Sequence, residues 1–147
     1  MTFTLSKERT IMSILLSDGD KLTLRTAAYG AVALLSAAGA GRSAHRIATD
    51  GSIALASATG PIGHVLAEES TGVDLKGKTV AQLADHVLPA LTRAMELLRA
   101  QAPAEADNFR GIVMVAVEAA TRGEPSPAVA AMTGKIVAAL DAAEVTA

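Results

Sequence analysis

Cysteine and tryptophan are absent from this chain of 147 residues, which also has only one tyrosine and two phenylalanines. Without cysteine the protein cannot form disulfides, iron–sulfur clusters or thiolate zinc sites, and it cannot use a thiol as a nucleophile. Charge is also scarce, since charged residues make up 19% of the chain and the net charge is −2. No nucleic-acid partner is expected, because a phosphate-binding surface needs clustered Lys and Arg and here these residues are scattered.

Alanine dominates what is present. The chain is 50% hydrophobic, and 32 of its residues are alanine, the strongest helix former and a small side chain. This composition predicts closely packed helices. The mean hydropathy of +0.36 indicates more apolar surface than one chain needs, so we expect a homo-oligomer, specifically a homodimer, that buries the surplus between subunits.

The chain carries no segment typical of secretion or membrane insertion. The charged cluster near the N-terminus includes Glu8, and the apolar run after it covers only residues 11–16, which is unlike a secretory signal. The longer uncharged runs, 26–41 and 51–67, fall short of the ~18–20 residues needed to span a bilayer. We therefore expect a cytoplasmic protein without stable membrane insertion.

The hydrophobic periodicity predicts an all-α fold. Residues 1–147 are expected to form a single domain, a helical bundle or an irregular array of about six helices. The expected helices cover about residues 7–16, 21–38, 49–69, 80–101, 103–122 and 127–143. The sequence leaves open whether 49–69 is one kinked helix or two, because Gly60 and Pro61 interrupt it.

Short polar side chains mark where these helices are expected to begin. The expected N-caps are Asp18 or Asp20, Thr49 or Asp50, Thr79 in a capping box with Gln82, and Ser126. Pro89 removes a helical hydrogen bond and predicts a bend. The β-branched run 111–117 could be a buried strand, but its flanking caps favour a helix and no convincing second strand is present to pair with it.

The histidines are the first candidates for chemistry. His64 and Glu68 are four residues apart and would share a helix face, and His86 could add a third metal ligand, which makes a metal-dependent enzyme one hypothesis. The simpler interpretation is that His64 and His86 are partly exposed polar residues. His45 falls in a basic segment, 42–46, that is expected to be a surface loop.

No catalytic motif accompanies these histidines. A nucleophile elbow and a phosphate-binding P-loop are both missing. Residues 39–43 superficially resemble a glycine-rich anion loop in which Arg42 and Arg46 could bind phosphate, but the end of a helix explains the stretch better. The sequence therefore specifies no catalytic residue, metal or cofactor, and it favours a non-enzymatic role.

Small residues supply the main hypothesis. Alanines at 27, 31, 33 and 37, together with Gly111 and Gly134, predict close helix approach. The expected function is self-association or binding of a protein partner, with Leu and Val of the second and fifth expected helices at the seam. The alternative is a small-ligand-binding protein with a cavity near the Pro61 and Pro89 kinks. His64, His86 and Arg93 would then contact an apolar or acidic ligand.

The C-terminal part of the chain carries a family resemblance. Residues 102–110, the apolar helix after them, the Gly-Glu-Pro-Ser-Pro connection and the final helix resemble part of a family of small, all-helical bacterial proteins without an assigned activity. The resemblance covers about a third of the chain. It implies a helical fold and a bacterial source, and it implies no function.

Overall fold

The computed structural model describes residues 16–39, 41–67, 75, 79–123 and 125–146. Over these residues the protein is all-α, with six helices and no strand, as the composition and periodicity predict. The helices are α2 (Asp18–Gly39), α3 (Gly41–Ala56), α4 (Gly60–Ala67), α5 (Val80–Gln101), α6 (Pro103–Ala120) and α7 (Pro127–Thr146). The helix expected at residues 7–16 lies almost wholly outside the described part.

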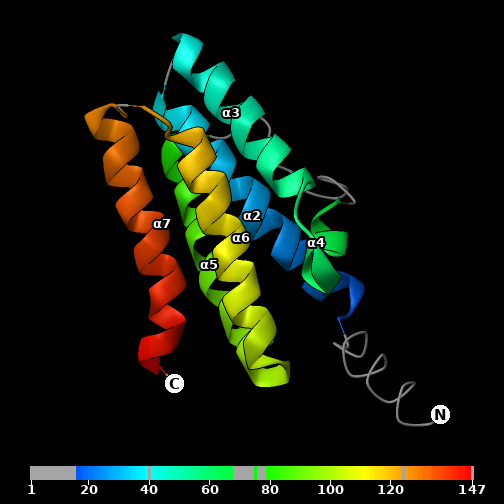
Figure 1. The fold of residues 1–147 in the computed structure, drawn as a ribbon. Coiled ribbons are helices and arrows are strands. Elements are labelled where there is room, and N and C mark those ends of the chain that lie inside the picture. The colour runs from blue at the N-terminus through cyan, green and yellow to red at the C-terminus, as the bar shows by residue number, and fades with distance from the viewer. Residues whose placement is uncertain (1–15, 40, 68–74, 76–78, 124, 147) are drawn as a thin grey trace, which may run out of the picture.

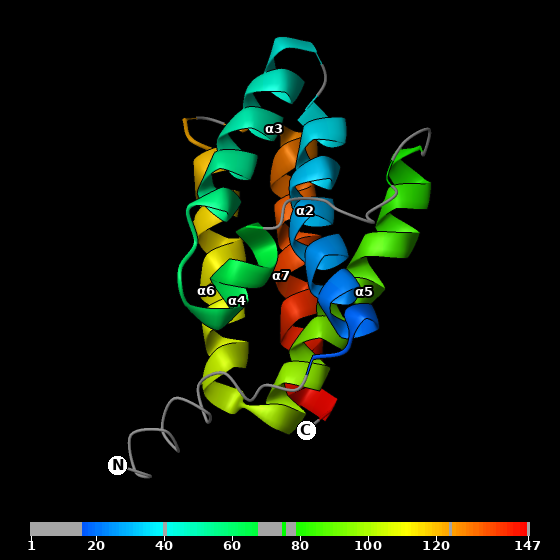
Figure 2. The ribbon, with the colours of Figure 1, turned by 90° about the vertical axis from the view of Figure 1, so that its right-hand side faces the viewer.

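Helix α2 is the centre of the fold. It contacts each of the other five described helices, with α3 and α4 on one side and α5 and α7 on the other (Figure 1). Figure 2 shows α3 lying along both α2 and α6. The wide apolar surface of α2 explains this position, because Leu24, Leu34 and Leu35 are all fully buried although they do not share one stripe.

Local capping sets the ends of α2. The helix begins with a capping pair in which Asp20 N donates to Ser17 Oγ at 3.0 Å and Ser17 N donates to Asp20 Oδ2 at 3.3 Å. The prediction of an aspartate N-cap is therefore wrong, because Ser17 holds the cap position and Asp20 is its reciprocal partner. The predicted end at the Gly-Ala-Gly sequence is confirmed, since α2 stops at Gly39.

The third expected helix differs most from the structure. Helix α3 begins at Gly41 rather than near residue 49, so Thr49 and Asp50 lie inside it instead of capping it. The N-terminal end of α3 is held by tertiary contacts, because Ile47 is buried and Ser36 Oγ on α2 donates to Ala44 O at 2.8 Å. The basic segment predicted as a loop is therefore helical.

A tight turn separates α3 from α4. Gly60 has a φ of +82°, a conformation that favours glycine, and it begins α4 one residue before Pro61. Gly63 follows, where an added Cβ would lie 2.5 Å from the carbonyl carbon of Ala58. Residues 49–67 therefore belong to two helices rather than one kinked helix.

Helix α5 matches its predicted bounds. Gln82 N donates to Thr79 Oγ1 at 3.1 Å and Thr79 N donates to Gln82 Oε1 at 2.9 Å, which confirms the capping box. The helix runs continuously through Pro89. Its apolar face, which includes Leu83, Val87, Leu91 and Leu98, is buried, although Val80, in the first turn, is 40% exposed.

The last two helices both pack against α2 and α5. The β-branched run at 111–117 is helical in α6, as its caps predict, and α7 begins after Ser126, whose Oγ accepts from Val129 N at 3.2 Å. Helix α7 continues to Thr146, past the fraying expected after residue 143. Thr92 on α5 fastens α7 by donating to Ala139 O at 2.6 Å.

Two glycines let neighbouring helices approach α2. A Cβ added to Gly30 would lie 2.5 Å from Val87 Cγ2 on α5, and one added to Gly51 on α3 would lie 2.7 Å from Val32 Cγ1 on α2. Each valine therefore fills a space that only a glycine leaves open. The two contacts therefore let α3 and α5 pack closely against opposite faces of α2.

The predicted close contacts at Gly111 and Gly134 are wrong within the described part of the chain, because no atom of another described element lies within 4 Å of a Cβ added at either position. We expect Gly134→Ala to raise the free energy of unfolding by about 0.5–1 kcal/mol, since glycine in a helix is weaker than alanine by that amount. Urea denaturation tests this prediction. A loss of stability would mean that a subunit or ligand occupies the space beside Gly134.

Candidate functional site

The three histidines lie on three different helices. His45 is on α3, His64 on α4 and His86 on α5, and all three side chains are exposed. Across the described ranges, no group of three His, Cys, Asp or Glu side chains could hold a metal ion. Glu68, the remaining member of the metal-site hypothesis, lies outside those ranges. The described side chains thus provide no metal centre around His64 and His86.

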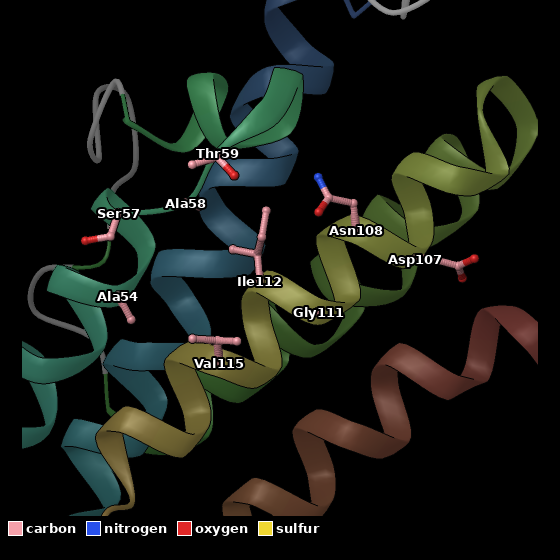
Figure 3. A pocket seen from close by; sticks show the side chains of 9 residues that line it. All are labelled: Ala54, Ser57, Ala58, Thr59, Asp107, Asn108, Gly111, Ile112 and Val115. Atoms are coloured by element: carbon pink, nitrogen blue, oxygen red, sulfur yellow. The ribbon is translucent and has the colours of Figure 1, made fainter.

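Two surface depressions lie near the prolines where the sequence predicts a cavity. We call the larger of the two the apolar groove. It has a volume of about 450 Å³ and runs between the α3–α4 turn and α6 (Figure 3). Its lining consists of Ala54, Ser57, Ala58, Thr59, Asp107, Asn108, Gly111, Ile112 and Val115. Pro61 does not line the groove, although the turn just before Pro61 does.

The polar side chains around the apolar groove are mostly bonded already. Asp107 accepts from Arg99 at 2.9 Å, Ser57 donates to Ile53 O at 2.8 Å, and Asn108 donates to Glu105 at 3.4 Å. These bonds leave few polar groups that could form hydrogen bonds with a ligand. The groove therefore provides mainly apolar contacts, including Val115, whose side chain is 57% exposed.

The α2–α5 depression is separate and smaller, at about 310 Å³. It is lined by Leu22, Thr23 and Thr26 from α2 and by His86, Pro89, Ala90 and Arg93 from α5. Two of the three predicted ligand-binding residues, His86 and Arg93, therefore meet here beside Pro89. His64 lines neither this depression nor the apolar groove. The single cavity expected near both prolines is thus two separate surface depressions.

The glycine-rich stretch at residues 39–43 ends α2 and opens α3. Arg46, one of its two expected phosphate ligands, is one turn into α3 and forms an ion pair with Asp50 at 3.3 Å. The side chain of Arg42 lies outside the described ones. A phosphate site here receives no support from Arg46, because the carboxylate of Asp50 already neutralises it.

Sequence reasoning missed Val115 and Thr26, which line these depressions, and Ile53, which is exposed on α3 next to the lining residue Ala54. Ile53 and Val115 are exposed apolar side chains within helices that otherwise bury theirs, and Thr26 is a polar side chain inside the apolar surface of α2. A signal for Thr26 existed in the sequence, because a threonine within a wide apolar helix face is unusual. Exposure of Ile53 and Val115 depends on helix packing and has no local signal.

Comparisons of the chain with protein-family models, curated proteins and solved structures find no match. The resemblance of the C-terminal part to small bacterial helical proteins therefore stays a prediction. Across the described residues, no helix is both long enough and apolar enough to cross a membrane. Function must be argued from the two depressions themselves.

Proposed function

We propose that this protein has a non-enzymatic role and acts by self-association, as a homodimer that covers the apolar groove. The observation that carries the proposal is the pair Ile53 and Val115, which are 59% and 57% exposed while most large apolar side chains of the described helices are buried. Ile53 lies one turn before Ser57 on α3, so it flanks the same groove as Val115. Exposed apolar side chains on both sides of one groove mark a contact surface.

A second copy of the chain fits the charge pattern of α6. The exposed face of this helix and its end carries Asp107, Gly111, Val115, Glu118 and Arg122 in order. Val115 lies midway between Asp107 and Arg122 along the chain. Two copies of α6 crossing antiparallel at Val115 would therefore bring each Arg122 near the partner's Asp107, as a two-fold interface requires.

Gly111 supports the same arrangement. Glycine inside a helix costs about 0.5–1 kcal/mol relative to alanine, and no neighbour among the described residues uses the space beside Gly111. A partner helix crossing there would use that space and contact the backbone closely. Although Asp107 is bonded to Arg99, its side chain is 70% exposed, so its carboxylate stays accessible to the partner.

The cytoplasmic location is part of the proposal and rests on the sequence alone.

We expect Val115→Glu to weaken dimerisation at least tenfold, because it buries a charge at the centre of an apolar contact. Sedimentation equilibrium over a concentration series measures this change in Kd. Val80→Glu is the matched control, since Val80 is an exposed valine on another helix and its replacement should leave the Kd unchanged. A wild-type chain that is monomeric at every concentration would rule out the proposed function.

Charge reversal tests the antiparallel geometry. Asp107→Arg and Arg122→Asp should each weaken the dimer, because each would place like charges together across the two-fold axis. The double variant should restore most of the affinity, because the cross-subunit pair is re-formed with its signs exchanged. A double variant no better than the single variants would exclude this crossing of α6.

A further inference from the structure

The α2–α5 depression brings together a guanidinium, an imidazole and threonine hydroxyls. On α5, His86, Pro89, Ala90 and Arg93 recur at a spacing of three to four residues and share one face. Thr26 and Leu22 approach from α2, and no aspartate or glutamate is among the lining residues. The surroundings therefore favour an anionic group over a cation.

Thr26 is the unusual member of this set. Its side chain belongs to a residue only 7% exposed, the single buried polar residue of the described chain. Thr23, Thr121 and Thr133 each donate to the carbonyl four residues earlier, whereas the hydroxyl of Thr26 forms no hydrogen bond within the described part of the chain. Within those residues this hydroxyl stays unsatisfied, so it is left for water or a ligand to bond.

The hydroxyl of Thr26 can reach such a partner. Among the described residues, no fully buried side-chain nitrogen or oxygen lacks a hydrogen bond. The oxygen of Thr26 must therefore touch open space, and Thr26 lines the depression. A ligand seated there could bond to this oxygen from within hydrogen-bonding distance.

Arg93 and His86 are available to the same ligand. Both side chains are exposed, and neither forms an ion pair within the described chain. A guanidinium presents two parallel N–H donors that fit a carboxylate or phosphate, and an imidazole ring supplies a further N–H. Leu22, Pro89 and Ala90 add apolar wall, which suits a short hydrocarbon body.

We propose that the α2–α5 depression binds a small carboxylate carried on a short apolar chain. Arg93 forms an ion pair with the carboxylate, and His86 and Thr26 each add one hydrogen bond. Leu22 and Pro89 contact the hydrocarbon chain. The volume of about 310 Å³ is at the lower end of the range for small-ligand sites. This site is lined by α2 and α5 and not by α6, so its ligand binding can be tested independently of dimerisation.

The test is an amide NMR titration of the full chain with sodium hexanoate. We expect saturable shifts confined to residues near 22–26 and 86–93, with a Kd near or below ~1 mM. Arg93→Gln should weaken hexanoate binding roughly tenfold or more, because a charge-assisted pair is lost. Lys135→Gln is the matched control, since it removes one exposed positive charge on α7 and should leave the Kd unchanged.

Thr26→Val separates binding from folding. It removes only the unpartnered hydroxyl, so the melting temperature should stay level or rise while hexanoate binds several-fold more weakly. Unchanged binding by this variant would overturn the role of Thr26. Equal shifts with 1-hexanol would overturn recognition of an anion, and phosphate binding as tightly as hexanoate would overturn the apolar body. Absence of any saturable shift would overturn the site itself.

Discussion

Phe109→Ala is expected to lower the free energy of unfolding by about 3–5 kcal/mol, the largest effect of any single truncation proposed for this chain. Phe109 is fully buried on α6 and heads the largest buried side chains of the described core. The other buried apolar side chains of the described core are aliphatic or methionine, and packed side chains relax only partly into the space that a deleted ring leaves. Natural domains have only about 5–15 kcal/mol in total, so this variant should be close to unfolding at room temperature.

Guanidinium denaturation at a fixed protein concentration measures this loss, with the concentration held constant because dimerisation would add to stability. Phe109→Leu keeps an apolar side chain and should lose only about 1–2 kcal/mol. Val80→Ala, at an exposed valine of α5 outside the proposed dimer contact, should change stability by less than about 0.5 kcal/mol. Equal losses for Phe109→Ala and Val80→Ala would contradict the placement of Phe109 in the core.

Gly30→Ala is expected to destabilise the protein by about 1–3 kcal/mol, although alanine is the better helix former. The new Cβ would lie 2.5 and 2.9 Å from the two γ-carbons of Val87 and 3.2 Å from its β-carbon. Rotation of the valine side chain cannot relieve the contact with its β-carbon, so α2 and α5 must move apart. The same substitution at Gly134, where space is open, should instead stabilise.

A second-site substitution tests the cause of this loss. Val87→Ala alone should destabilise by leaving a cavity, whereas Gly30→Ala combined with Val87→Ala should lose at least 1 kcal/mol less than the two single losses together. The double-mutant cycle uses the same denaturation measurement for all four proteins. Additive losses would show that Gly30 matters for a reason other than contact with Val87.

Part of the candidate site could be predicted from the amino-acid sequence. The spacing of His86, Pro89 and Arg93 on one helix predicts that these side chains share a face, and the structure brings them into one depression. The third predicted residue, His64, lies on α4, and no local pattern reports where α4 packs. Thr26 joins His86 and Arg93 only because α2 lies beside α5.

By itself, the amino-acid sequence determined the helical class and most helix ends. Capping side chains, prolines and glycines act within one helical turn, so Thr79, Pro103 and Ser126 mark the starts of α5, α6 and α7 without help from the rest of the chain. The start of α3 escaped prediction, because the contacts of Ile47 and Ser36 that favour it are tertiary.

Only the tertiary structure decided which small residues are contacts and which are openings. Gly30 and Gly51 each receive a valine from another helix, whereas Gly111 and Gly134 face open space, although all four are glycines within helices. The difference depends on which side chain a neighbouring helix presents, and that follows from how the helices pack around α2. Helix formation is local, but the close approach that a glycine permits is decided by residues far away in the chain.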